Sequence, residues 1–184
     1  MAGRVSGLVI RIDDGDTLRQ VGVAIDVFQR ELSDFNALWR DMTVALETWQ
    51  ADAFDTEGAS LGARWEDLSD KYEEQKAFTH PGAGILERSG NMLEALTDSG
   101  SQFAFREISG DGSQFVFGTQ QLDYPGLHVT GTDKMPRRNP FVPTSALEGD
   151  MVDILERHGG RAARKARLKY TPNPTGTDIE FSDG

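Results

Sequence analysis

The chain has 184 residues and a formal net charge of −11, which argues against free-standing adhesion to DNA or to an anionic membrane. It contains no cysteine, so disulfides and thiolate chemistry are excluded. No apolar run approaches the roughly 20 residues of a membrane helix, and the N-terminal apolar stretch is too short for a signal peptide. We expect one domain, or one domain with arms, that stays in the cytoplasm or joins an assembly there.

The N-terminal residues predict a strand, a turn and a helix start. Residues 7–12, "GLVIRI", predict a short strand, and residues 13–16, "DDGD", a turn. Calcium loops also use closely spaced aspartates, but the twelve-residue pattern and its final glutamate are missing, which favours the plain turn. Thr17 and Gln20 fit a capping box, which predicts that a helix begins there.

The next part of the chain carries the clearest helical period. Ser33 and Asp34 can cap a second helix, which predicts a kink or short break near residues 32–34. The periodic residues suit either a coiled-coil seam or a helix face packed on a sheet, and we favour the sheet. They are spaced alternately by four and three, which places all of them on one helix face: Phe28, Leu32, Phe35, Trp39, Met42, Leu46 and Trp49.

Residues 55–98 predict shorter elements. Residues 55–64 are loose, and residues 65–78 predict a short helix or turn with Trp65 and Leu68 buried. Pro81 and two glycines interrupt the chain at 79–84. A short helix bent near Gly90 follows, with this apolar side: Ile85, Leu86, Met92, Leu93 and Leu96.

Two strands at residues 102–108 and 113–119 flank "SGDG", which predicts a hairpin. Residues 123–143 hold four prolines and two glycines and predict an irregular loop, and loops of this length are often functional. Thr144 or Ser145 caps a last helix ending near Gly159, whose predicted buried side is Leu147, Met151, Ile154 and Leu155.

The pattern divides the chain into a domain at 1–158 and a basic extended arm at 159–184, with Gly159 and Gly160 as a hinge. Residues 171–184 lack helical periodicity, so the arm alone should be disordered and dispensable for stability. Its basic side chains could contact nucleic acid. We favour docking on an acidic neighbouring surface instead, through Arg161, Arg164, Lys165, Arg167 and Lys169.

The reactive residues predict no catalytic, metal or cofactor site, and hence no enzyme. His80, His128 and His158 are not at metal-ligand spacing, so structural or surface roles are expected. For His158, at the predicted helix end, a cation would favour the helix dipole. No phosphate-binding glycine loop and no nucleophile turn is present.

A set of residues stands in a fairly specific order and spacing: Phe54, Gly62, Trp65, Leu68, Ser69, Lys76, Ile85, Leu86, Ser89, Gly90, Leu93, Arg138, Pro140 and Phe141. This order of motifs resembles the phage virion morphogenesis family, the tail completion proteins of tailed phages, over about residues 8–158. Three departures affect loop details: Pro125 follows Tyr124, Val129 follows His128, and Asn139 is inserted before Pro140.

The resemblance implies an α+β fold, with helices packed on a small antiparallel sheet. The long Pro/Gly-rich loop and the extended C-terminal arm are expected from the sequence itself, and the basic arm lies outside the resemblance. The resemblance also implies a structural virion protein of the neck or tail end, assembled in the host cytoplasm. Its partners would be further copies in a ring, usually sixfold, the tail tube protein and head-side connector proteins. DNA would pass through the ring without specific binding, and no membrane is involved.

We expect "GARWEDLS", residues 62–69, to fix the long helix to the sheet. Arg137 and Arg138 should pair with an acidic neighbour, and residues 177–181 should add a strand to one. The alternative is a nucleic-acid-binding or regulatory protein acting through the basic arm. The predicted interface consists of Tyr124, Leu127, His128, Met135, Arg137, Arg138 and Phe141, the five basic residues of the arm, and Ile179 and Phe181.

Overall fold

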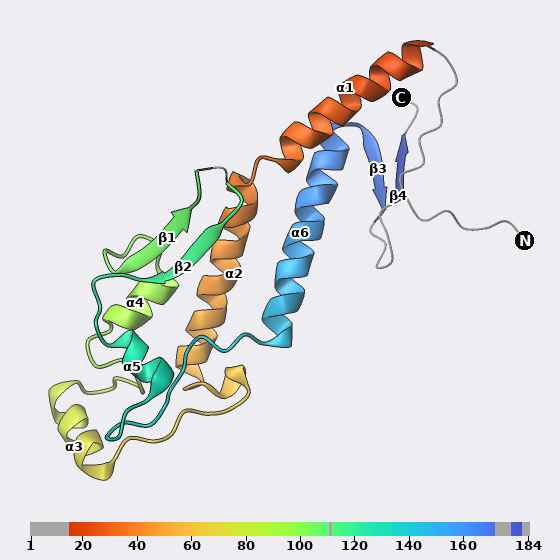
Figure 1. The fold of residues 1–184 in the computed structure, drawn as a ribbon. Helices are drawn as coiled ribbons and strands as arrows, with labels where there is room; N and C mark the ends of the chain where they lie inside the picture. The colour runs from red at the N-terminus through yellow and green to blue at the C-terminus, as the bar shows by residue number, and fades with distance from the viewer. Residues whose placement is uncertain (1–14, 111, 172–177, 182–184) are drawn as a thin grey trace, which may run out of the picture. The chain divides into compact units, whose positions relative to one another are not determined.

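The computed structural model describes residues 15–110, 112–171 and 178–181 and has the predicted α+β fold (Figure 1). The predicted strand at 7–12 lies outside these residues. The elements are α1 (Gly15–Leu32), α2 (Asn36–Asp55), a 3-10 turn η1 (Ala59–Leu61), α3 (Asp70–Thr79), α4 (Asn91–Thr97), β1 (Ala104–Ile108), β2 (Phe115–Thr119), α5 (Pro125–Thr130), α6 (Ser145–Lys165), β3 (Leu168–Thr171) and β4 (Asp178–Phe181).

The chain forms two compact units. The first contains the residues up to Trp39 and those from Val152 onward, and the second is Arg40–Met151. These units differ from the predicted division at residue 158. The first unit joins two segments that are far apart in the sequence, and the second spans several predicted elements.

The predicted break between the first two helices is confirmed. α1 ends at Leu32 and α2 begins at Asn36. Asp34 Oδ1 accepts a hydrogen bond from the Asn36 amide at 3.3 Å, whereas the Ser33 hydroxyl donates to the Gln29 carbonyl. Asp34 therefore acts as the cap. The predicted start of α1 is too late, since the helix already begins at Gly15 and includes Thr17.

The predicted hinge at Gly159 and Gly160 is wrong, because α6 continues through both glycines to Lys165. A glycine inside a helix costs about 1 kcal/mol relative to alanine. Burial of the following turn offsets that cost. Ala163 and Ala166 are buried and pack with Ala24, Val27 and Phe28 of α1.

His158 lies inside α6 and not at its end. Its side chain is buried, Nε2 donates to the Leu32 carbonyl at 3.1 Å, and the ring stacks on Phe35. The predicted buried side of α6 is confirmed for Leu147 and Ile154 but wrong for Leu155, which is 50% exposed. Thr144 Oγ1 accepts from the Leu147 amide at 3.2 Å, as a cap.

The C-terminal strand pairs inside its own chain. β3 and β4 are antiparallel, with Tyr170 opposite Ile179 and Leu168 opposite Phe181. The expectation that residues 177–181 wait for a neighbouring subunit is corrected, because residues 168–171 already supply a partner strand.

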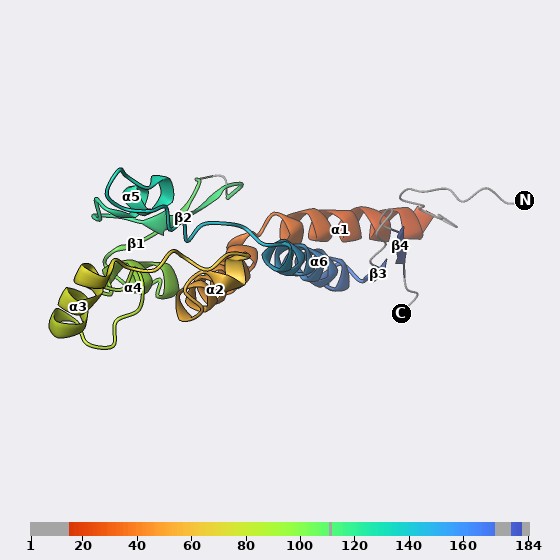
Figure 2. The same cartoon turned by 90° about the horizontal axis from the view of Figure 1, so that it is seen from below.

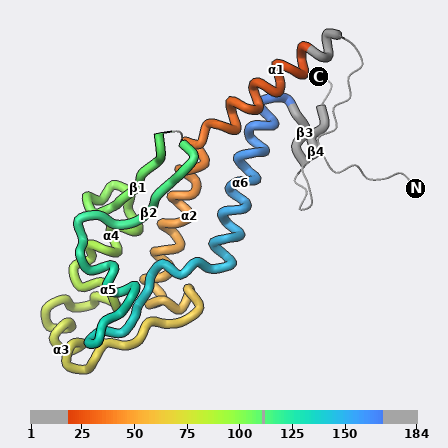
Figure 3. Tube along the Cα trace, viewed as in Figure 1, coloured from red at the N-terminus to blue at the C-terminus, as the bar shows by residue number. Residues whose placement is uncertain are grey.

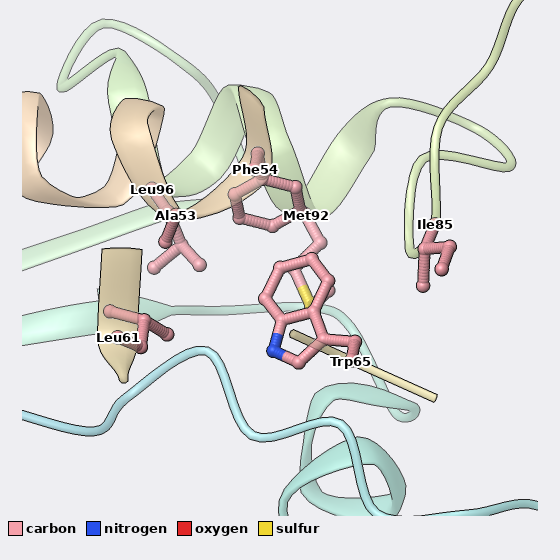
Figure 4. Packing of buried hydrophobic residues seen from close by; sticks show 7 residues of the cluster. All are labelled: Ala53, Phe54, Leu61, Trp65, Ile85, Met92 and Leu96. Atoms are coloured by element: carbon pink, nitrogen blue, oxygen red, sulfur yellow. The ribbon is translucent and has the colours of Figure 1, made fainter. Parts of the chain in front are cut away.

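The core of the second unit gathers α2, α4 and the motif segment (Figure 4). Trp49 of α2 and Phe117 of β2 both pack against it. The sheet-packing interpretation does not hold for the start of the helical stripe, because Phe28 packs with Ala163 and Ala166 at the C-terminal end of α6. The stripe itself is half-buried apart from the exposed Leu32. The buried cluster consists of Ala53, Phe54, Leu61, Trp65, Ile85, Met92 and Leu96.

The predicted hairpin is confirmed. β1 and β2 pair antiparallel, with Arg106 opposite Phe117. Figure 2 shows α4 on one side of this hairpin and α5 on the other. The helices predicted in residues 65–78 and 85–98 are present in part, as α3 and α4. Residues 65–69 and 85–90 are not helical, and Gly90, at φ +75°, stands directly before α4 and does not bend a longer helix.

Candidate interaction surface

The motif segment 62–69 is fixed by Trp65. The indole is 6% exposed, and its ring meets Phe54 edge-on at a centroid distance of 5.5 Å. The Trp65 amide donates to the Glu57 carbonyl at 2.7 Å. Leu68 is half-buried against the same core. The predicted burial of Trp65 is therefore confirmed, and Leu68 packs beside it.

Gly58 is required by this arrangement. Its φ is +87°, a region that side chains rarely adopt, and a Cβ at this position would lie 2.6 Å from the Trp65 ring. The glycine lets the chain turn closely around the indole. The backbone and the aromatic side chain therefore depend on each other.

Arg138 fastens the long loop to the motif segment. The residue is 5% exposed; Nε donates to the Glu66 carbonyl at 2.7 Å, and Nη2 donates to the Asp67 carbonyl at 2.8 Å. Figure 3 traces the loop, in green to teal, near the yellow motif segment. The Arg138 amide also donates to the His128 carbonyl at 2.8 Å.

The expectation that Arg138 pairs with an acidic neighbour is therefore corrected. Its guanidinium is already bonded to two carbonyls of its own chain, since the loop packs down on the motif segment. Burial lowers the pKa of Arg138, while Glu66 and Asp67 raise it. Arg137, the adjacent residue, is exposed.

Lys76 of the motif and the nearby Glu57 also make hydrogen bonds inside the fold. The amine of Lys76, which is buried, donates to the Gly84 carbonyl, and burial lowers the pKa of Lys76. Glu57 accepts from Arg64 at 2.6 Å and from the Ile85 amide at 3.3 Å. The hydrogen bond from Arg64 is the largest effect in lowering the pKa of Glu57. The polar motif residues thus hold turns together.

A surface groove of about 470 Å³ opens beside these contacts. Its carboxylates come from Glu57 and from the motif segment and α3, and its two cations are Arg64 and Lys76, which already have partners. Within residues 15–110, 112–171 and 178–181, no group of three or more side chains suits a metal ion.

The loop 123–143 is less irregular than predicted, because it contains α5. Tyr124 and Phe141 pack partly against the core, so they stabilise the fold directly. Met135 is half-buried, and Leu127 is 48% exposed. Of the predicted loop contacts, Leu127 and Arg137 are therefore the most accessible.

His128 lies on α5, within the loop 123–143. Its ring meets Tyr124 edge-on at 5.9 Å, and its buried Nδ1 has no hydrogen-bond partner in the described part of the chain. Burial is the larger cause that lowers the pKa of His128, and the Arg138 charge lowers it further. The neutral form of His128 is therefore the one that suits this place.

The predicted basic arm begins as the end of α6, up to Lys165, and continues into β3 and β4. Arg161 is half-buried, while Arg164, Lys165 and Arg167 are exposed. Lys165 Nζ lies 2.5 Å from Glu31 Oε2, an ion pair between α6 and α1. The side chains of Lys169, Ile179 and Phe181 lie outside the described part, although their backbones belong to β3 and β4.

Arg106 has a structural role that the sequence did not predict. Nη2 lies 3.3 Å from Glu47 Oε1 of α2 and donates to the Ala95 carbonyl of α4 at 3.1 Å. The guanidinium carbon lies 3.7 Å from the Phe117 ring centroid. The alternation of residues along the strand does not predict this role, because it depends on Glu47 and Ala95, which lie in other elements.

Comparison of the chain with protein-family models, with curated proteins and with solved structures finds no match in any of the three. No helix in the described part of the chain combines the length and apolar character needed to cross a membrane.

Proposed function

We propose that this protein is a structural virion protein of the neck or tail end, which forms a ring that completes or terminates the tail and joins it to the head connector. One observation carries the proposal. The apolar residues behind the motif resemblance come from distant parts of the chain but pack in one core: Phe54, Trp65, Leu68, Ile85, Leu86, Leu93 and Phe141.

The polar motif residues support the same interpretation. Arg138 and Lys76 donate to main-chain carbonyls of their own chain, so they hold the framework together. A motif that encodes a framework is what a scaffold protein requires, since its function lies in the surfaces that the framework presents.

The accessible apolar side chains are suited to partner contacts. Phe78 is 90% exposed on α3, and Leu127 is half exposed on α5. Large exposed apolar side chains are frequent at protein–protein interfaces and cost solvation free energy when they stay in water. Arg137 adds an exposed charge near Leu127 for an acidic partner.

Electron microscopy of particles assembled without this protein tests the proposal. Abnormally long tails indicate a terminator, and normal tails without heads indicate a joining role. Supplying the wild-type chain should restore complete particles. Particles of normal form and infectivity in its absence would rule the proposal out.

The alternative of a nucleic-acid-binding protein has less support. Lys165 is paired with Glu31, and the whole chain is strongly acidic. Binding to DNA at physiological salt, with an affinity that falls steeply as salt rises, would favour the alternative.

A further inference from the structure

The β1–β2 hairpin has two edges that carry no third strand in the described part of the chain. Each strand pairs only with the other, and no further strand joins this sheet among residues 15–110, 112–171 and 178–181. An isolated two-stranded sheet is marginally stable, and an open edge presents unpaired main-chain donors and acceptors. Such an edge is a template for another strand.

The register shows which groups the edges present. The Gln120 amide donates to the Phe103 carbonyl, and the Ser109 amide donates to the Gln114 carbonyl, which sets the alternation of bonded pairs. The main-chain groups of Phe117 in β2 and of its partner Arg106 in β1 therefore point outward, away from the hairpin.

β2 lacks the usual protection of an edge strand. Soluble proteins place lysine, other charges or proline on such strands to prevent pairing with other chains. β2 reads "FVFGT" and contains none of these. Val116 at its centre is 47% exposed. The strand thus combines an open edge, an apolar outer face and no charge.

We propose that a second copy of this chain covers these edges, with β2 of one copy paired antiparallel to β1 of the next. Both strands have five residues, so β2 of one copy can pair with β1 of the next over its whole length. Each copy then contributes the edge of β2 to one neighbour and the edge of β1 to the other. Glu107, exposed on the outer face of β1, would meet no like charge, because β2 has no charged residue.

The choice of a second copy rests on the proposed ring function. Copies related by a rotation axis have their β1 strands in the same direction relative to that axis. Because β2 runs opposite to β1 within each copy, β2 of one copy meets β1 of the next copy in antiparallel orientation. The contact joins two different surfaces, and a contact of this kind closes into a ring where the rotation permits.

Thr119→Pro in the full-length chain tests the edge. The Thr119 amide points outward like that of Phe117, so proline removes a donor of the edge and leaves the hydrogen bonds between β1 and β2 in place. Thr119→Val is the matched control, since valine keeps the amide. Sedimentation velocity over a range of concentrations measures association, and thermal unfolding measures stability.

We expect the wild type and Thr119→Val to associate alike and Thr119→Pro to lose the larger species at unchanged stability. Unchanged association of Thr119→Pro overturns the inference, as does a wild type that stays monomeric at every concentration. Neither result rules out the proposed function, because a ring can form on a tail through other surfaces. That proposal fails only if particles lacking the protein are normal.

Cross-linking gives an independent measurement, because the wild-type chain has no cysteine. A Val116→Cys chain mixed with a Glu107→Cys chain of different tagged mass should form mixed dimers with a short bifunctional thiol reagent. The two variants must stay separate, since these residues face each other within one hairpin. Val44→Cys, at an exposed position of α2, replaces Val116→Cys as control. Equal yields from both mixtures would refute the proposed contact.

Discussion

Replacing Arg138 by methionine should destabilise the second unit. Methionine keeps much of the apolar stem but removes both donors to the Glu66 and Asp67 carbonyls. A hydrogen bond from a charged donor contributes about 1.5–3 kcal/mol, so the two bonds together contribute about 3–6 kcal/mol. Release of the buried guanidinium from its desolvation cost offsets part of this, which leaves about 2–4 kcal/mol.

Urea unfolding followed by tryptophan fluorescence measures this change, since Trp65 lies next to the affected segment. The midpoint should fall at an unchanged slope if unfolding remains cooperative. Arg137→Met is the control: an exposed side chain away from such contacts should change stability by less than about 0.5 kcal/mol. Arg138→Lys, which retains one donor, should lie between the wild type and Arg138→Met.

Equal effects of Arg138→Met and Arg137→Met would refute the assignment of Arg138 as the residue that fastens the loop. A large effect of Arg138→Met together with a fully stable Arg138→Lys would mean that the charge matters and the two-carbonyl geometry does not.

Four further variants test other contacts of the fold. Trp65→Ala should cost about 3–5 kcal/mol in thermal unfolding, and Gly58→Ala, which forces a Cβ onto the Trp65 ring, about 1–3 kcal/mol; neutral results would place the indole elsewhere. The pKa of His128 is lowered from 6.5 in the folded chain, so the unfolded chain takes up the proton first; stability should be complete above that pH and decline as the pH falls through it. His128→Gln should lessen the decline measured between pH 7.5 and 5.5, and an unchanged decline would contradict this. Truncation after His158 should speed hydrogen exchange in α1, because it removes Ala163 and Ala166, whereas unchanged exchange would support a dispensable arm.

The sequence by itself determined the features that depend on near neighbours. The break after Leu32 follows from the capping ability of Asp34, and the hairpin follows from a glycine-rich turn between two alternating segments. The cap at Thr144 is equally local. The burial of Trp65 was also predictable, since a large aromatic side chain in a charged segment gains most by leaving water.

Only the tertiary structure decided the features that depend on distant partners. Arg138 and Arg137 are adjacent and chemically alike, but only the carbonyls of Glu66 and Asp67, some 70 residues away, turn Arg138 inward. The same holds for α6, whose two glycines predicted a hinge. Packing of the next turn against α1 extended the helix, because burial against a distant segment outweighs a local propensity of about 1 kcal/mol per glycine.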